Sequence, residues 1–264
     1  MSGQRCVITV DPQPEPAARL VVFPHAGGSS TTYRRWADLF SSDVELSVVE
    51  YPGHGSRMGE ELVDDHAVIV EEVCAVLARS DAPTALFGHS MGALIAFEAA
   101  RTLTAGGRPP IHLFISAAQT PPALDSWAHR TWTDEELAEE MLRFGGTPQE
   151  FLQDVDIYEA FIKILRCDYR LLDQYVYEPD PLLAMGITAF YGLADDYVTY
   201  EHVSGWRALT GAGFDTYPLA GGHFYDAASI PELCGAVESV LETLSGDSLI
   251  REPVGVLPLG GGTI

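Results

Sequence analysis

The sequence lacks any long hydrophobic run. No segment of its 264 residues approaches the roughly 20 consecutive apolar residues that a membrane-spanning helix needs. Residues 1–15 also lack the short apolar stretch of a secretory signal peptide. We therefore expect a cytoplasmic protein that makes no contact with membranes.

Basic residues and cysteines are also scarce. Lysine and arginine number 15 against 38 aspartates and glutamates, for a formal charge of -23, and such an acidic chain is repelled by nucleic acid and by anionic membranes. The 4 cysteines, at positions 6, 74, 167 and 234, form no C-x-x-C pair, which argues against a zinc site or a disulfide framework. We expect neither a metal ion nor a cofactor.

The hydrophobic content of 47% is enough for a large buried core. Short apolar runs alternate with helical patterns over most of the chain. This alternation predicts an α/β fold, with a mostly parallel central sheet flanked by helices and with ligands at the carboxyl ends of the strands. We expect strands at residues 4–10, 19–23, 44–51, 85–87, 111–117, 187–191 and 214–219.

The clearest chemical motif is Gly88-His89-Ser90-Met91-Gly92, which follows an apolar strand pattern and precedes a helical one. A serine between two glycines in this context is typical of a nucleophile elbow. There the serine occupies a strained turn, and the glycines let helix and strand pass closely. We predict that Ser90 is a nucleophile. The alternative is an ordinary turn whose serine caps the helix.

A second loop rich in glycine and small residues, 24–30, follows the expected strand 19–23. Such a loop can curl so that its backbone N–H groups point inward. In a hydrolase with a nucleophile elbow, this loop supplies one amide of the oxyanion hole, and the residue after the nucleophile supplies the other. We assign these roles to the backbone amides of Ala26 and Met91.

A serine hydroxyl becomes a good nucleophile when a histidine takes its proton and a carboxylate holds that histidine in the right tautomer. With a nucleophile elbow, the chain order is serine, acid, histidine. Asp195 and Asp196 follow the expected strand 187–191, and His223 follows the expected strand 214–219 in a glycine-rich loop. We predict the catalytic triad Ser90, Asp195 and His223, with Asp196 as the alternative acid.

The pattern changes between residues 119 and 185, where helices are expected at 133–144, 149–153 and 157–175. We interpret 119–185 as a helical lid inserted between two parts of a hydrolase core, 1–118 and 186–245. Its many large apolar side chains are suited to line an acyl channel. Residues 246–264, with two prolines and three consecutive glycines, indicate a C-terminal extension.

Four motifs together resemble the stand-alone type II thioesterases of polyketide and nonribosomal peptide biosynthesis. They are FPHAGGS at 23–29, YPG at 51–53, FGHSMGA at 87–93 and GGHF at 221–224, and the resemblance spans residues 20–244. Two lid segments, GGTP at 145–148 and LRCDY at 165–169, are also similar to that family. The chain departs from it at His54, where the family often has arginine, and at Asp196, where it often has proline.

This resemblance implies an α/β-hydrolase fold and the hydrolysis of acyl thioesters on the phosphopantetheine arm of acyl or peptidyl carrier proteins, which clears stalled or mis-primed synthases. It implies the same roles for Ser90, Asp195, His223 and the amides of Ala26 and Met91. Because carrier proteins are usually acidic, we expect docking on Arg166 and Arg170 of the lid. We also expect a monomer.

Two other functions are compatible with the sequence. An acyl-CoA thioesterase or a small-molecule carboxylesterase would use the same triad on free substrates. A non-catalytic, ligand-binding member of the same fold would not use it at all.

Overall fold

The computed structural model describes residues 6–126, 132–144, 154–179 and 181–250. Its centre is a seven-stranded sheet with the order β1-β3-β2-β4-β5-β6-β7. Only β1 is antiparallel to its neighbour, and the other strands are parallel. The strands are β1 (Val7–Asp11), β2 (Ala18–Phe23), β3 (Val44–Val49), β4 (Thr84–His89), β5 (His112–Ser116), β6 (Gly186–Gly192) and β7 (Phe214–Leu219).

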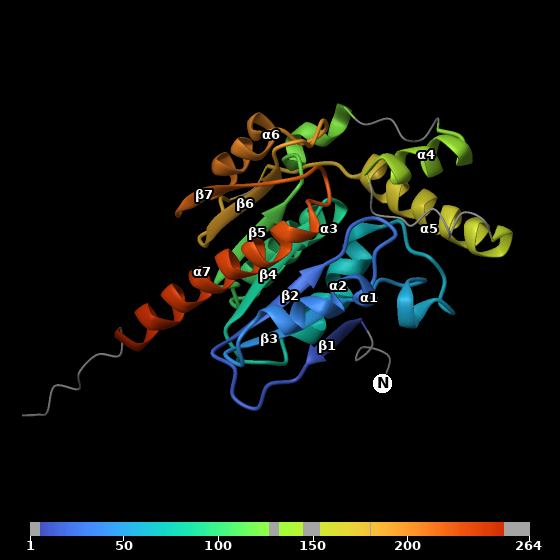
Figure 1. Cartoon of the computed structure of the whole chain (residues 1–264). Helices are drawn as coiled ribbons and strands as arrows, with labels where there is room; N and C mark the ends of the chain where they lie inside the picture. Colours follow the sequence, from blue (N-terminus) through green and yellow to red (C-terminus); the bar gives the residue numbers. More distant parts are fainter. Residues whose placement is uncertain (1–5, 127–131, 145–153, 180, 251–264) are drawn as a thin grey trace, which may run out of the picture.

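Helices cover both faces of the sheet (Figure 1). One face packs against α2 (His66–Leu77) and α3 (Met91–Ala105), and the other against α7 (Ile230–Ile250) and the short α1 (Ser30–Tyr33). Alternate residues along a strand point to opposite faces of the sheet, so they belong to different hydrophobic cores.

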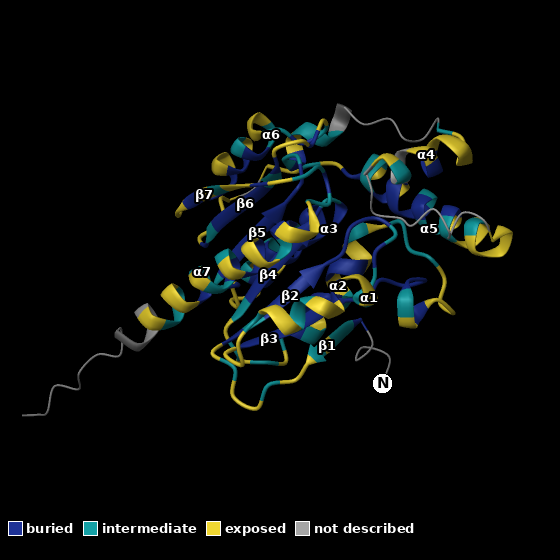
Figure 2. Ribbon diagram, viewed as in Figure 1, coloured by how far each residue is buried: buried dark blue, intermediate teal, exposed yellow. Residues whose placement is uncertain are grey.

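In β2, for example, Phe23 belongs to the core beside α2 and α3, whereas Val22 belongs to the core beside α1 and α7. The central strands are therefore buried on both sides, as Figure 2 shows, which explains their continuous apolar sequences.

Between β5 and β6 the chain forms α4 (Asp134–Phe144) and α5 (Val155–Gln174), which lie beside the sheet near α2 (Figure 1). Asp154 caps the start of α5, because its carboxylate accepts hydrogen bonds from the backbone N–H groups of Asp156 and Ile157. Its apolar face, including Ile162 and Leu165, joins the core of the α3 side. The described part of 119–185 thus contains these two α-helices and a short tighter helix at Pro121–Ser126, and the helix expected at 149–153 lies outside the described residues.

The expected strands agree with the observed ones to within about three residues at each end, a typical uncertainty for element boundaries. After β6 the chain forms the short α6 (Tyr200–Ser204), followed by a turn of tighter helix at Gly205–Leu209. Helix α7 was not predicted, and it continues to Ile250, so the beginning of the segment 246–264 is helical.

None of the helices in the described ranges is both long enough and apolar enough to cross a membrane.

Candidate active site

Ser90 occupies a sharp turn between β4 and α3. Its backbone has φ 54° and ψ -121°, a conformation that costs a residue with a side chain about 1–3 kcal/mol. The two neighbouring glycines make the turn possible. A Cβ on Gly88 would lie 2.4 Å from the Ala93 Cα, and a Cβ on Gly92 would lie 2.0 Å from the Phe23 carbonyl oxygen. The structure thus has the strand, strained turn and helix that the motif predicts.

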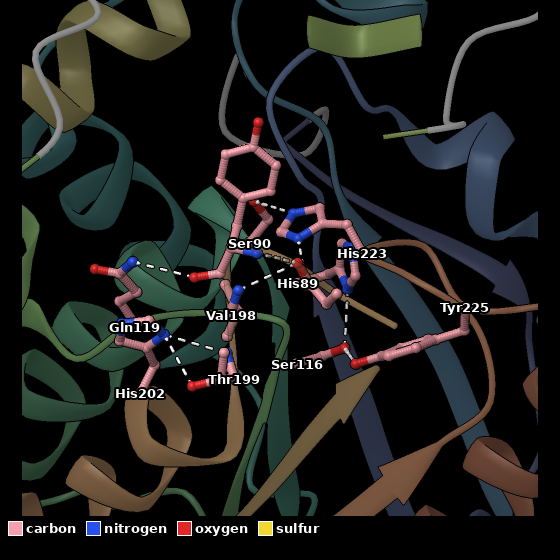
Figure 3. Close-up of polar contacts among 11 residues, drawn as sticks. His89, Ser90, Ser116, Gln119, Val198, Thr199, His202, His223 and Tyr225 are labelled. Carbon is pink, nitrogen blue, oxygen red and sulfur yellow. Dashed lines mark hydrogen bonds and ion pairs between the residues drawn. The ribbon is translucent and has the colours of Figure 1, made fainter. Parts of the chain in front are cut away.

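His223 contacts both Ser90 and Asp195. Figure 3 shows the side chains of Ser90 and His223 close together. The Ser90 hydroxyl is 3.0 Å from His223 Nε2, and His223 Nδ1 is 2.9 Å from Asp195 Oδ2. An ionised carboxylate only accepts hydrogen bonds, so Nδ1 carries the proton toward Asp195 and the Nε2 lone pair faces Ser90. This arrangement can remove the proton of the serine hydroxyl.

The loop after β6 distinguishes the two neighbouring aspartates. The second oxygen of Asp195 accepts hydrogen bonds from the backbone N–H groups of Tyr197 and Val198, at 2.9 and 3.1 Å. These bonds hold the Asp195 carboxylate toward His223, and the side chain is buried. Asp196 is exposed. The carboxylate beside the histidine therefore belongs to Asp195.

A hydrogen-bond chain that the sequence analysis did not anticipate lies beneath the histidine loop. The Tyr225 hydroxyl is 2.7 Å from Ser116 Oγ, which is 2.8 Å from His89 Nδ1 (Figure 3). Tyr225 has a positive φ of 60°, two residues after His223. This chain ties the loop after β7 to the ends of β4 and β5, and so helps to fix the position of His223.

Two other histidines near His223, namely His89 in this chain and His25 beside it, carry no charge. Burial, with the proximity of His223 and His25, holds the pKa of His89 well below its ordinary value. Burial, with His223 and His54 nearby, lowers the pKa of His25 to about 3. Both rings are therefore neutral in the physiological range. They do not replace His223 as the proton acceptor, because neither is within hydrogen-bond distance of Ser90 in the described structure.

The two amides assigned to the oxyanion hole lie at the ends of adjacent strands. Met91 is the first residue of α3, so its N–H has no acceptor within the helix. Ala26 follows β2, which pairs with β4 in parallel register. Neither N–H donates a hydrogen bond to the part of the chain that the structure describes. The close contact of Gly92 with Phe23 places the loop of Ala26 against the start of α3.

A small cavity of about 60 Å³ opens at Ser90 and His223. Its remaining walls are mostly apolar and come from α3, the end of β5, α5 and the loop after β6. They are formed by Met91, Leu94, Ala117, Ala118, Gln119, Leu124, Tyr169, Leu172 and Val198. The space beside Ser90 is therefore suited to a short apolar group.

The two lid arginines expected to attract a carrier protein are already paired. Arg166 binds the carboxylate of Asp134 and donates to the Trp132 carbonyl at 3.1 Å, while Arg170 lies 3.7 Å from Asp64. The groove that they line also contains Asp173. The expected basic patch therefore contains acidic side chains beside its two arginines, and docking of a carrier protein there stays a prediction.

The four cysteines are buried free thiols. Burial raises the pKa of each of them, to about 11 for Cys74 and about 12 for Cys234, so they are protonated and weakly reactive. Within the described ranges, no group of three or more histidine, cysteine, aspartate or glutamate residues is placed to hold a metal ion.

The mostly parallel sheet and the serine at its carboxyl edge define an α/β-hydrolase. Comparison with protein families gives the narrower class, because the thioesterase domain profile matches residues 18–241. The chain therefore belongs to the thioesterase family and is a hydrolase that acts on thioester bonds.

Three related proteins match this chain over most of their own length. The chain is 34% identical to thioesterase TesA of Mycobacterium marinum over 225 residues, which cover 84% of this chain and 90% of that protein. The structure of RedJ, a thioesterase from the prodiginine pathway of Streptomyces coelicolor, matches with a TM-score of 0.80 and 33% identity over 87% of this chain and 94% of RedJ. The structure of BorB, a type II thioesterase from the borrelidin biosynthetic cluster, matches with a TM-score of 0.81 and 32% identity. The match covers 89% of this chain and 97% of BorB.

Proposed function

We propose that this chain is a type II editing thioesterase that removes acyl groups from the phosphopantetheine arm of acyl or peptidyl carrier proteins. Its relatives in polyketide and nonribosomal peptide pathways support this function. The observation that carries the proposal is the hydrogen-bonded series Ser90, His223 and Asp195 at the mouth of an apolar cavity. We expect the enzyme to act in the cytoplasm as a monomer.

In the first half of the reaction, His223 Nε2 takes the proton of the Ser90 hydroxyl while Ser90 Oγ attacks the thioester carbonyl carbon. The carbonyl oxygen becomes an oxyanion that accepts hydrogen bonds from the amides of Ala26 and Met91. Each such bond contributes about 3 kcal/mol to the stability of the transition state. The carbon–sulfur bond then breaks, and His223 returns the proton to the departing thiolate. The products are the free phosphopantetheine thiol and an acyl ester on Ser90.

In the second half, water replaces the thiol. His223 Nε2 removes a proton from the water, whose oxygen attacks the ester carbonyl, and the same amides hold the new oxyanion. When the ester bond breaks, His223 gives the proton to Ser90 Oγ and the carboxylic acid leaves. Asp195 stays ionised throughout and stabilises the imidazolium that forms in each half. The residues of the chain therefore supply every proton transfer that the reaction needs.

The test is a comparison of one acyl group presented on three carriers. Hydrolysis of the acyl-carrier protein, the acyl-coenzyme A and the matching oxygen ester is measured for the wild type and for Ser90→Ala. We expect turnover of the carrier-bound group to be well above the other two and to be abolished in the variant. Faster hydrolysis of the free thioester or ester would assign the chain to acyl-CoA thioesterases or carboxylesterases. Absence of turnover with all three would indicate a ligand-binding role.

A further inference from the structure

The Asp168 carboxylate connects helix α5 to the loop that carries Ala26. Asp168 lies in α5 and is only 2% exposed. Its Oδ2 atom accepts a hydrogen bond from the Gly27 N–H at 2.7 Å and is 3.0 Å from His54 Nε2. The Gly27 N–H belongs to the peptide group that immediately follows Ala26. A carboxylate from the lid region therefore orients the backbone next to one of the two amides assigned to the oxyanion.

The partners of His54 determine its protonation. His54 Nδ1 is 3.0 Å from the Pro52 carbonyl oxygen, which can only accept a hydrogen bond, so Nδ1 must carry a proton. Nε2 faces the Asp168 carboxylate, which is also an acceptor when ionised. Both ring nitrogens are satisfied as donors only if His54 is an imidazolium. The site then contains a buried ion pair, with both side chains 3% exposed.

The surroundings of His54 favour its charged form on balance. Burial alone would lower the pKa of His54. Four effects outweigh burial and raise this pKa above the ordinary value of 6.5: the charge of Asp168, the hydrogen bond to Asp168, the hydrogen bond to the Pro52 carbonyl and the charge of Glu50. Two other groups lie near the His54 ring. The Tyr51 ring meets it edge-on, with the two ring centroids 5.5 Å apart, and His25 is neutral. Glu50 is itself anchored by the Ser30 and Ser56 N–H and hydroxyl groups.

Packing gives the same loop a second contact with α5. Gly27 has φ 75°, and a Cβ there would lie 2.9 Å from the Phe161 ring and 3.1 Å from Leu165. The loop backbone therefore lies directly against α5, with the Asp168 carboxylate bonded to it. A change in the His54–Asp168 pair acts on a backbone segment that has little free space.

We propose that His54 and Asp168 are positioning residues that hold the Ala26–Gly27 backbone in the geometry needed for oxyanion binding, and that protonation of His54 makes this geometry dependent on pH. The inference rests on the proposed function, because it assumes that the Ala26 amide binds an oxyanion. Neither residue touches the substrate. Their effect is on the rate of the chemical steps rather than on the affinity for the thioester.

The direction of the pH effect follows from the charged form. Because the pair raises the pKa of His54, the imidazolium persists at low and neutral pH, and the proton is lost as the pH rises through that raised value. Loss of the proton removes one N–H donor of the His54 ring and leaves the Asp168 carboxylate without a positively charged partner. We expect kcat to fall on the alkaline side for this reason.

The experiment uses His54→Gln, Asp168→Asn and His54→Arg, with His66→Gln as a matched control. His66 is a half-buried histidine outside the site, and its Nδ1 atom lies 4.0 Å from Oδ1 of Asp65. Each purified variant is assayed from acidic to alkaline pH with an acyl N-acetylcysteamine thioester, a small mimic of the phosphopantetheine thiol, and its thermal unfolding is recorded. We expect His54→Gln and Asp168→Asn to lose at least about tenfold in kcat, with KM within about twofold, since complete loss of one oxyanion donor costs about 10²–10³.

His54→Arg restores a permanent cation, so we expect it to retain activity and to lack the alkaline fall. If the larger side chain prevents folding, His54→Gln still tests the proposal, because it too should lack that fall while having a lower maximum. A wild-type rate and pH profile in His54→Gln, or an equal loss of kcat in His66→Gln, would refute the positioning role. So would a change confined to KM.

A second measurement does not depend on catalysis. Histidine NMR titration of Ser90→Ala protein, with the His54 signal assigned from His54→Gln, should show an imidazolium that persists above the ordinary pKa and is lost earlier in Asp168→Asn. A His54 ring that is already neutral below pH 6.5 would overturn the inference. A persistent imidazolium in a protein that hydrolyses no thioester would refute the proposed function and with it the assigned role, while leaving the ion pair established.

Discussion

Replacing Asp195 by asparagine should stop catalysis by reversing the tautomer of His223. In the wild type, Asp195 Oδ1 accepts from the backbone N–H groups of Tyr197 and Val198, and Oδ2 faces His223 Nδ1. An asparagine oxygen would keep the two backbone donors, which leaves its NH2 group facing His223. Nδ1 would then accept rather than donate, so the ring proton would move to Nε2 and point at Ser90.

A histidine with a proton on Nε2 cannot take the serine proton. The same exchange of aspartate for asparagine in a serine protease lowers kcat about 10⁴-fold, which corresponds to about 5 kcal/mol of transition-state stabilisation. We expect a loss of this size in Asp195→Asn. Asp196→Asn is the matched control, since Asp196 is exposed, and it should stay within about twofold of the wild type because a surface change rarely perturbs a buried network.

The assay is steady-state hydrolysis of an acyl-carrier protein, with thermal unfolding to verify that both variants are folded. A large loss in Asp196→Asn with little change in Asp195→Asn would show that the acid has been misassigned. A loss below about tenfold in both variants would show that no carboxylate in this loop controls the tautomer of His223, and the proposed mechanism would be wrong.

Two further predictions concern the cavity and the elbow. The cavity of about 60 Å³ has room for roughly four to six water-sized groups, so the wild type should prefer thioesters of short acyl groups, such as butyryl, to those of long ones. Leu172→Ala should then raise kcat/KM for decanoyl relative to butyryl thioesters by about tenfold or more, and an unchanged ratio would show that Leu172 does not limit chain length. Gly92→Ala should lower the free energy of unfolding, measured in urea, by about 3 kcal/mol or more, because the new Cβ would overlap the Phe23 carbonyl. Gly59→Ala is the control: a Cβ at Gly59 would meet open space, so this variant should unfold like the wild type.

The sequence alone was sufficient for the features that depend on neighbouring residues. The apolar runs predict the strands, because a buried parallel sheet needs side chains that are apolar on both faces. The pattern of strand, glycine, serine, glycine and helix predicts the strained turn at Ser90, because only that order of residues fits it. The chain order of serine, acid and histidine limits the triad candidates to Asp195, Asp196 and His223.

The tertiary structure decided the contacts between residues that are distant in the chain or that have equivalent local patterns. Asp195 and Asp196 are indistinguishable by spacing, and the backbone N–H groups of Tyr197 and Val198 separate them. The pair His54 and Asp168 joins residues 114 positions apart, which no local pattern encodes. Local sequence determines backbone preferences, whereas the charge and direction of a side chain depend on which groups the packed fold places around it.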